Sequence, residues 1–338
     1  MRAAVLHGIG NLEIEDVDTP TCGAREVLLR VGAATICRTD LKMYTQGQRD
    51  LVLPRILGHE VAGTVVEVGR EVTEVLEGER IQVAPGFACG RCWYCVQGRS
   101  NLCENISILG FSYDGGFSEY VLLPEAAISS GSLNPIPDPL SFEEAALAEP
   151  VACCINGLEM AKIGFDETIL IVGGGPIGNI FYHLSQIAGA SKVHIVEILP
   201  ERREFMRRYQ IDALDSIESV QDEVDILIPA CSDPDALIKG IKKVKRRGKV
   251  IAFSGLSVDD PQLLDPNIIH YNELTMVGAY GCTTWQNREA LTLMASRKLD
   301  LRYLLTDQIP IEKILDGLRM VDAKEGMKVV VKNIRKGG

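Results

Sequence analysis

The sequence lacks the long apolar runs that membrane proteins need. Nowhere in its 338 residues is there a stretch of roughly 18 or more apolar residues, the length that a membrane-spanning helix requires. The N-terminus, MRAAVLHGIGNLEIEDV, also lacks an apolar segment of the length found in secretory signals. No internal repeat or low-complexity segment is present. We therefore expect a soluble, cytoplasmic protein with no membrane partner.

A broad positive surface is also missing. The formal net charge is -11, and Lys and Arg are scattered except for the run KKVKRR at 242–247. We expect that run at a solvated helix end, where cations complement the carbonyl end of the helix dipole. No nucleic-acid partner is expected, and a neutral or weakly charged small substrate fits better.

The composition and length favour a folded protein with two cores. Apolar residues make up 46% and charged residues 24% of the chain, ordinary proportions for a globular protein. Residues 1 to about 130 hold short Val-, Leu- and Ile-rich runs that predict strands, among them EVLLRVGAA, EVAGTVVEVG, RIQVAP and FSEYVLLP. Residues 141–164 predict a capped helix between two domains. The apolar runs TILIVGGGPIG, KVHIVEI, VDILIPA and KVIAFSG then alternate with helical patterns, which indicates βαβ units and a buried parallel sheet.

Four of the ten cysteines are crowded into CGRCWYCVQGRSNLC, at positions 89, 92, 95 and 103. Four thiolates at this spacing can close tetrahedrally around one Zn²⁺ and leave no open position, as a structural site requires. Unrelated buried thiols or a zinc ribbon that binds nucleic acid are the alternatives, and the acidic charge argues against the ribbon. The cluster favours metal binding in a reducing compartment over a disulfide framework.

A second set of metal donors lies outside this cluster. Cys37 occurs in ATICRTDLK, and His59 and Glu60 occur together in ILGHEVAG. A thiolate, an imidazole and a carboxylate suit a catalytic zinc that keeps a position for water or substrate. Taken singly, a cysteine or a histidine is more often a structural residue.

A dinucleotide fingerprint follows an apolar strand. Gly173, Gly175 and Gly178 form GxGxxG, whose glycines permit a tight turn, close approach of a pyrophosphate and close packing of helix on strand. A plain glycine turn is the alternative. Glu197 lies 19 positions beyond Gly178, near the spacing expected for the acid that holds ribose hydroxyls. An acid there disfavours the 2′-phosphate of NADP, so NAD is expected and NADP is less favoured, although Arg202 and Arg203 nearby could offer charge to a phosphate.

These motifs together resemble the zinc-containing medium-chain alcohol dehydrogenases, in particular the polyol (sorbitol-type) and threonine dehydrogenases. The resemblance covers essentially the whole chain. It implies an α/β fold class, with a GroES-like β-rich catalytic domain at 1–148 that carries the structural zinc lobe and is completed by 287–338. A doubly wound, parallel-sheet Rossmann domain that binds NAD is implied at 149–286. It also implies a homotetramer or homodimer, in which the nucleotide-binding domains meet.

The resemblance also assigns roles to single residues. It implies two zinc ions per chain, a catalytic one at Cys37, His59, Glu60 and Glu149 and a structural one at Cys89, Cys92, Cys95 and Cys103. Glu149 matches a carboxylate that can exchange with water at the metal, and Asp40 matches the acid that fixes the tautomer of the histidine ligand, although a plain surface acid and a capping role are the alternatives. The residues implied in catalysis are Thr39, Glu60 and Glu149, with Thr39 receiving the hydroxyl proton. The residues expected to bind the cofactor are Gly173, Gly175, Pro176, Ile177, Gly178, Glu197, Arg202, Ser254, Gly255, Leu256, Ala279 and Tyr280.

The sequence departs from this family in two places. Lys42 stands where many relatives end the proton relay with a histidine, and an ammonium has no lone pair to accept a proton, so water is expected to take the last step. Gly281 or Cys282 stands where many polyol enzymes carry an arginine near the substrate, so a different polar group must orient the substrate.

The predicted function is transfer of a hydride from a secondary alcohol, a polyol or sugar-derived hydroxyl, to NAD, with reversible reduction of the ketone. Zinc acts as the Lewis acid and the cofactor carries the redox chemistry. An L-threonine-type 3-hydroxy amino-acid dehydrogenase is the alternative within enzymes. A non-catalytic, zinc-stabilised binding protein is the alternative from another class.

Overall fold

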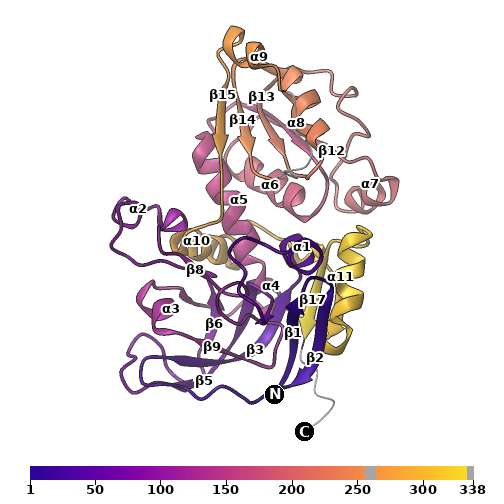
Figure 1. Cartoon of the computed structure of the whole chain (residues 1–338). Coiled ribbons are helices and arrows are strands. Elements are labelled where there is room, and N and C mark those ends of the chain that lie inside the picture. The colour runs from indigo at the N-terminus through magenta and orange to yellow at the C-terminus, as the bar shows by residue number, and fades with distance from the viewer. Residues whose placement is uncertain (256–263, 333–338) are drawn as a thin grey trace. The chain divides into compact units, whose positions relative to one another are not determined.

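The computed structural model describes residues 1–255 and 264–332, and the chain divides into two compact units (Figure 1). Unit 1 comprises Met1–Ala152 and Cys282–Gly338, and unit 2 comprises Cys153–Gly281. These limits lie within five residues of the domain boundaries expected from the sequence, 148/149 and 286/287. The two units are described separately below.

Unit 1 is built on a seven-stranded sheet in the order β10-β6-β5-β3-β17-β16, with β9 paired to β3. Its central strands β3 (Val27–Thr35) and β5 (Glu60–Val68) are antiparallel and almost wholly apolar where they are buried. The C-terminal strand β17 (Lys328–Lys332) lies between β3 and β16 (Leu305–Pro310), so the end of the chain completes a sheet begun near its start. The remaining strands of this unit are β1 (Arg2–Gly8), β2 (Asn11–Asp16), β4 (Arg55–Ile56), β6 (Arg80–Val83), β7 (Gly86–Phe87), β8 (Ser107–Ile108), β9 (Tyr120–Leu123) and β10 (Leu133–Pro135).

Short helices cover the ends of this sheet. The helix α1 (Arg38–Gln46) follows β3 directly and packs against α11 (Ile314–Asp322). Helix α10 (Thr284–Ala295) begins with a capping box between Thr283 and Gln286. The other helices of this unit are α2 (Trp93–Val96), α3 (Glu125–Ser129) and α4 (Phe142–Ala146), with 3-10 turns at Ser100–Leu102, Arg302–Leu304 and Ile311–Lys313. The helix α5 (Ala148–Ala161) begins in unit 1 and continues into unit 2 from Cys153.

The single helix expected over 141–164 is wrong in one respect, because the chain forms α4 and α5 with a break at Leu147. The capping signal is confirmed: the Ser141 hydroxyl accepts from the Glu144 N–H at 3.2 Å, and the Glu144 carboxylate accepts from the Ser141 N–H at 2.9 Å. Pro150 explains the break, since it has no N–H with which to continue the helical ladder and is tolerated only in the first turn of a helix.

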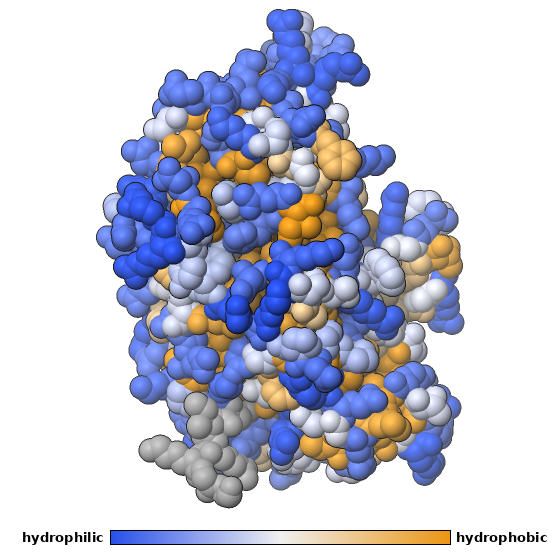
Figure 2. Space-filling view, turned by 180° about the vertical axis from the view of Figure 1, so that it is seen from behind, coloured by the Kyte–Doolittle hydropathy of each residue, from blue (hydrophilic) through white to orange (hydrophobic). Residues whose placement is uncertain are grey.

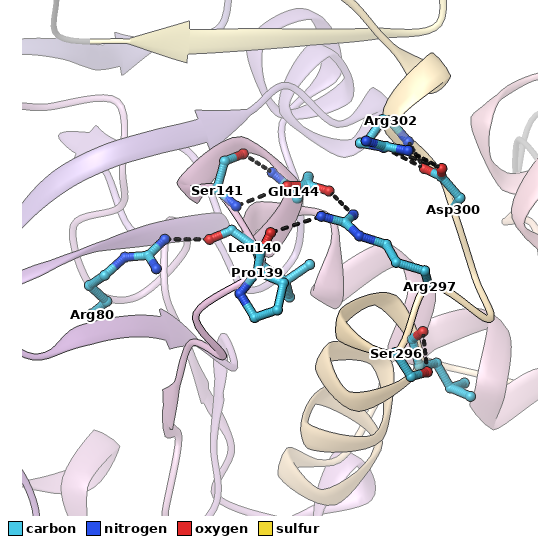
Figure 3. Close-up of polar contacts among 10 residues, drawn as sticks. Arg80, Pro139, Leu140, Ser141, Glu144, Ser296, Arg297, Asp300 and Arg302 are labelled. Atoms are coloured by element: carbon cyan, nitrogen blue, oxygen red, sulfur yellow. Dashed lines mark hydrogen bonds and ion pairs between the residues drawn. The ribbon is translucent and has the colours of Figure 1, made fainter.

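Two arginines hold the segment that leads into these helices (Figure 3). Arg297 donates to the Glu144 carboxylate and, at 2.8 Å, to the Pro139 carbonyl. Arg80, on β6, donates to the Leu140 carbonyl. The start of α4 is therefore fixed from two sides, and with it the first turn of α5.

Unit 2 has a five-stranded parallel sheet in the order β12-β11-β13-β14-β15. An isolated parallel bridge between Val196 and Leu214 adds the trace of a further strand beside β12. With this trace the strand order is that of a doubly wound dinucleotide fold, and the order reverses between β11 and β13. The strands are β11 (Thr168–Val172), β12 (Lys192–Val196), β13 (Val224–Pro229), β14 (Val244–Ala252) and β15 (Thr275–Gly278), and the helices are α6 (Pro176–Ile187), α7 (Pro200–Arg207), α8 (Pro234–Gly240) and α9 (Pro266–Tyr271).

The basic run at 242–247 is only partly at a helix end. Lys242 and Lys243 close a 3-10 turn (Ile241–Lys243), but the strand β14 already begins at Val244. The expectation of a helix end is therefore wrong for the last four residues, because parallel pairing with β13 overrides the local signal. On the face drawn in Figure 2, hydrophilic residues predominate and apolar ones form scattered groups. Among the described helices, none combines the length and hydropathy needed to span a bilayer.

Candidate metal and dinucleotide sites

The predicted four-cysteine cluster is assembled on one lobe of unit 1. The sulfur atoms of Cys89, Cys92, Cys95 and Cys103 all lie within 4.8 Å of one another. Cys92 precedes α2 and Cys103 follows a 3-10 turn, so local helical turns bring the sulfurs together. The Cys92 and Cys95 sulfurs are 3.5 Å apart.

The surroundings of these thiols fit a bound dication. Backbone N–H groups of Cys89 and Asn105 donate to the Cys103 sulfur at 3.2 and 3.4 Å, which stabilises a thiolate. Backbone N–H groups likewise lower the pKa of Cys89 to about 6. Burial and the neighbouring thiols raise the pKa of Cys95 to about 12. The lobe therefore favours ionisation of Cys89 and opposes ionisation of Cys95. Four thiolates at once require a compensating cation.

The second predicted donor set comes together at the ends of β3 and β5. Donor atoms of Cys37, His59 and Glu60 lie within 4.8 Å of one another. In the antiparallel pairing Thr35 is opposite Glu60, so the residues just after β3 and just before β5 meet at the same edge of the sheet. Glu60 is fully buried and His59 is 5% exposed.

Asp40 has both roles that the sequence allowed. Its carboxylate accepts from the backbone N–H of Cys37 at 2.8 Å and so closes the first turn of α1. The same carboxylate accepts from the Gly58 N–H at 3.3 Å and lies 3.4 Å from Nδ1 of His59. With Nδ1 facing Asp40, Nε2 is the ring nitrogen left for another ligand. Burial lowers the pKa of His59, but the charge of Asp40 outweighs it and holds that pKa well above its usual value.

Gly58 makes the turn that presents His59. Its φ is +95°, a region that side chains rarely adopt, and a Cβ there would lie 2.8 Å from the Phe117 ring. The glycine in the GHE motif is therefore required by the backbone as well as by packing.

Lys328 and Thr35 complete the centre, and the sequence analysis missed both. Lys328 is 4% exposed and its ammonium contacts both oxygens of the Glu60 carboxylate, at 2.6 Å for Oε1, and donates to the Ile36 carbonyl at 3.3 Å. The Thr35 hydroxyl also donates to Glu60. Burial lowers the pKa of Lys328, but the negative charges of Glu60 and Cys37 outweigh it and raise that pKa above its usual value. Lys328 therefore stays charged beside Glu60.

Two further predicted residues lie around this group. Thr39 is half-buried on α1, and its hydroxyl oxygen is 3.5 Å from the Cys37 sulfur. Glu149, in the first turn of α5, is 9% exposed, and its charge acts on Lys328. The Glu149 carboxylate is not within the group formed by Cys37, His59 and Glu60. The structure therefore places Glu60 with the two other ligand candidates, and Glu149 beside them.

The glycine fingerprint forms the turn between β11 and α6 in unit 2. Gly173 has φ +113°, and a Cβ on Gly178 would lie 1.8 Å from the Gly173 carbonyl oxygen. No other residue fits at Gly178. Asn179, fully buried on α6, donates to the carbonyls of Gly174 and Gly175 at 2.8 and 2.9 Å and so holds the loop. Sequence analysis missed this asparagine. Pro176 and Ile177 open α6.

Glu197 lies at the end of β12, beside this loop. It is 5% exposed, and its carboxylate accepts from the N–H groups of Gly174 at 2.9 Å and Leu199 at 2.8 Å. Arg203 donates to the carbonyls of Glu197 and Ile198, at 2.8 and 2.9 Å. Arg202 reaches the loop itself, since Nη1 would lie 3.4 Å from a Cβ on Gly175. Glu197, the glycine loop and Arg202 therefore lie close together.

The other predicted cofactor residues follow the carboxyl ends of β14 and β15. Ser254 donates to the Pro229 carbonyl at 3.4 Å, and Gly255 follows it. Ala279 is 8% exposed, whereas Tyr280 is 50% exposed. Asn156, on α5, donates to the carbonyls of Tyr280 and Gly281 at 3.4 and 3.0 Å and holds this turn. Leu256 lies outside the described residues. A ligand is expected at this edge of a parallel sheet.

Comparison with known proteins agrees with this geometry. Residues 23–135 match the alcohol dehydrogenase GroES-like domain. The sorbitol dehydrogenase of Bacillus subtilis is 33% identical over 98% of this chain and 97% of its own length. An L-threonine 3-dehydrogenase of Rhizobium etli is 30% identical over 95% of this chain and 94% of its own. A Sinorhizobium meliloti protein, described as a zinc-binding dehydrogenase and solved with NADP, is 29% identical, covers 98% of both chains and has a TM-score of 0.89.

A thiolate, imidazole and carboxylate centre in one unit and a dinucleotide loop in the other define a metal-type, nicotinamide-dependent dehydrogenase. The chain belongs to the zinc-containing medium-chain alcohol dehydrogenase family, in its polyol and threonine dehydrogenase branch. The fold class predicted from the sequence, a GroES-like domain with a Rossmann domain, is confirmed.

Proposed function

We propose that this protein is an NAD-dependent dehydrogenase of polyol or sugar-derived secondary alcohols, with a catalytic zinc at Cys37, His59 and Glu60 and a structural zinc at the four-cysteine lobe. The exchanging carboxylate is Glu149. The sorbitol dehydrogenase relative supports the substrate class. The closeness of the three donor atoms supports the resting ligand set.

The main support for this proposal is the charge of the buried groups around Cys37, His59 and Glu60. Three acidic groups, Cys37, Glu60 and Glu149, act on the buried ammonium of Lys328, and a fourth, Asp40, lies 3.4 Å from Nδ1 of His59. An excess of buried negative charge is costly unless a cation offsets it. A thiolate, an imidazole and a carboxylate are donors that zinc accepts, and they leave room for a fourth ligand. The residues present therefore fit a catalytic zinc.

When bound, zinc supplies the Lewis acidity that lowers the pKa of the substrate hydroxyl, and NAD supplies the hydride acceptor. The chain itself provides the proton path and the orientation of the ligands. The Thr39 hydroxyl accepts the proton of the alcohol. Lys42 is exposed, so the proton passes from Thr39 to solvent water. Asp40 fixes the imidazole, and Lys328 with Thr35 fixes Glu60.

A panel of sugar alcohols, inositols, 2,3-butanediol and L-threonine tests the substrate class. Turnover is followed by NADH absorbance, and kcat/KM is compared across the panel. Highest kcat/KM with a polyol supports the proposal. Highest kcat/KM with L-threonine would instead favour the second candidate, which the Rhizobium etli relative supports.

Metal analysis separates an enzyme from a zinc-stabilised binding protein. The two donor sets predict two zinc ions per chain, whereas a non-catalytic protein that keeps only the lobe would hold one. Atomic absorption on protein purified without chelator measures this ratio.

Glu197 is expected to select NAD over NADP. Its buried carboxylate would repel a 2′-phosphate, and Arg203 is already engaged by two backbone carbonyls. We expect Glu197→Ala to lower kcat/KM with NAD by about tenfold, the effect of losing a charged hydrogen bond to the ribose, and to leave kcat/KM with NADP unchanged or higher. Glu201→Ala, an exposed acid on α7, is the matched control and should change neither value. An equal loss with both cofactors would refute this role.

We also propose that the chain is a homodimer or homotetramer that pairs through β15. Within the part of the chain that the structure describes, β15 is an edge strand that pairs with β14 alone. Met276 on β15 is 36% exposed, and Tyr271, at the end of α9 just before this strand, is 75% exposed. Such an edge is a template for pairing with another copy. Met276→Lys should shift the mass in light scattering toward the 37.0 kDa of one chain, and Leu76→Lys, 69% exposed in unit 1, should not. A wild-type mass of one chain would refute the assembly.

A further inference from the structure

A second acid, Asp215, lies beside Glu197 at the carboxyl edge of the sheet in unit 2. Val196 and Leu214 form a parallel bridge. The Leu214 N–H donates to the Ile195 carbonyl at 2.8 Å, and the Glu197 N–H donates to the Leu214 carbonyl at 2.9 Å. Glu197 and Asp215 are the residues that follow this bridge, so their backbones are neighbours at roughly the 4.8 Å spacing of paired strands.

Two serines of the same loop hold the Asp215 carboxylate. The Ser219 hydroxyl donates to Oδ1 of Asp215 at 2.7 Å. Because Ser219 has then given its only hydroxyl proton, the Ser216 hydroxyl, 2.9 Å away, must donate to Ser219. The Ser216 oxygen in turn accepts from the backbone N–H of Ser219 at 3.3 Å. Asp215 is therefore held in place by its own loop while it stays exposed to solvent.

Arg203 supplies positive charge at the same edge. Its guanidinium is bonded to the carbonyls of Glu197 and Ile198. Hydrogen bonds from Ser219 and Ser216 and the positive charge of Arg203 lower the pKa of Asp215. Asp215 is therefore ionised at neutral pH, and its negative charge partly offsets the guanidinium. A guanidinium without this offset would attract a phosphate more strongly.

We infer that Asp215 is a second specificity-determining residue for the cofactor, whose negative charge beside Glu197 disfavours a 2′-phosphate. This inference rests on the proposed NAD dependence. The ribose hydroxyls are expected at Glu197, so a 2′-phosphate would bring its negative charge next to Asp215. NAD carries no phosphate at this position, and its pyrophosphate is expected at the glycine loop. Asp215 therefore acts against NADP without acting against NAD.

Isothermal titration calorimetry of the zinc-loaded protein with NADPH and with NADH tests this role. Asp215→Asn keeps an oxygen that accepts from Ser219 and removes only the charge. NADPH affinity should rise on the order of three- to fivefold, as expected for one exposed charge interaction, and NADH affinity should stay within about a factor of two. Asp212→Asn is the matched control, because Asp212 is also exposed but precedes the bridge at Leu214, and it should change neither affinity.

Ionic strength separates a charge effect from a change in the shape of the loop. Exposed charges are screened by salt, so the gain in NADPH affinity over wild type should largely disappear in about 1 M KCl. An unchanged NADPH affinity in Asp215→Asn, an equal change for both cofactors, or a gain that persists in high salt would overturn the inference while the NAD preference of the wild type stands. Wild-type binding of NADPH at least as tight as that of NADH would overturn the proposed NAD dependence and this inference with it.

Discussion

Cys37→Ser is expected to lower kcat/KM by about a thousandfold or more while the protein stays folded. The sulfur is one of three donors within 4.8 Å, and a serine hydroxyl does not replace a thiolate as a zinc ligand. Losing the Lewis acid removes several kcal/mol of transition-state stabilisation, and about 4 kcal/mol corresponds to a thousandfold in rate. Cys37 is half-buried in the loop between β3 and α1, outside the apolar core, so the fold should tolerate a near-isosteric hydroxyl. Kinetics and metal content of the same sample measure both effects.

Cys92→Ser, in contrast, should chiefly affect the folding of the four-cysteine lobe. Binding of a structural zinc is part of the folding free energy of its site, so losing one of four thiolates should loosen the lobe between Cys89 and Cys103. Limited proteolysis should then cut within this lobe, and Cys37→Ser should keep it resistant. Cys22→Ser, a cysteine outside both donor sets, is the matched control and should change neither activity nor proteolysis. Full activity in Cys37→Ser would refute the catalytic role of this residue.

The sequence predicts those parts of the candidate site that lie close together along the chain. The lobe cysteines and the glycine fingerprint are each contained in one short segment, where spacing alone determines the geometry. The pairing of Cys37 with His59 and Glu60 needs the antiparallel register of β3 and β5, which only the family resemblance could imply. Lys328 could not be predicted, because only the insertion of β17 beside β3 brings a residue near the end of the chain against Glu60.

The same limit applies to the chain of buried side-chain amides formed by Asn134, Gln82 and Asn287. Gln82 and Asn134 face each other across β6 and β10, and Asn287 reaches Gln82 from a helix 205 residues later in the chain. A single polar residue inside an apolar pattern is usually buried with a hydrogen-bond partner. That partner can be identified only once the fold is known. In this protein Lys328 pairs with Glu60, and the buried amides Gln82, Asn134 and Asn287 pair with one another.

Lys328→Met is expected to have the largest effect on stability. The ammonium contacts both oxygens of Glu60, and both side chains are almost completely removed from solvent. Removing one partner leaves a buried carboxylate without its counter-charge, which typically costs about 3 to 5 kcal/mol. Urea unfolding of wild type and variant at pH 7, both with the catalytic zinc removed by a chelator so that Lys328 is the counter-charge of Glu60, should show this loss. Lys332→Met, four residues further along β17, breaks a more exposed ion pair with Glu143 and should cost about 1 kcal/mol or less.

Two further measurements distinguish this charge effect from a simple loss of packing. Glu60→Gln in the Lys328→Met background removes the stranded charge and should recover part of the lost stability, whereas a packing defect would persist. Because the pKa of Lys328 is raised above its usual value of 10.5, the stabilisation from the pair is fully present below pH 10.5 and is lost only as the pH rises through the higher folded value. The stability difference between wild type and Lys328→Met should therefore be constant from pH 7 to about 9. A difference that shrinks across this range, or a loss no larger than that of Lys332→Met, would show that Lys328 does not hold Glu60 by its charge.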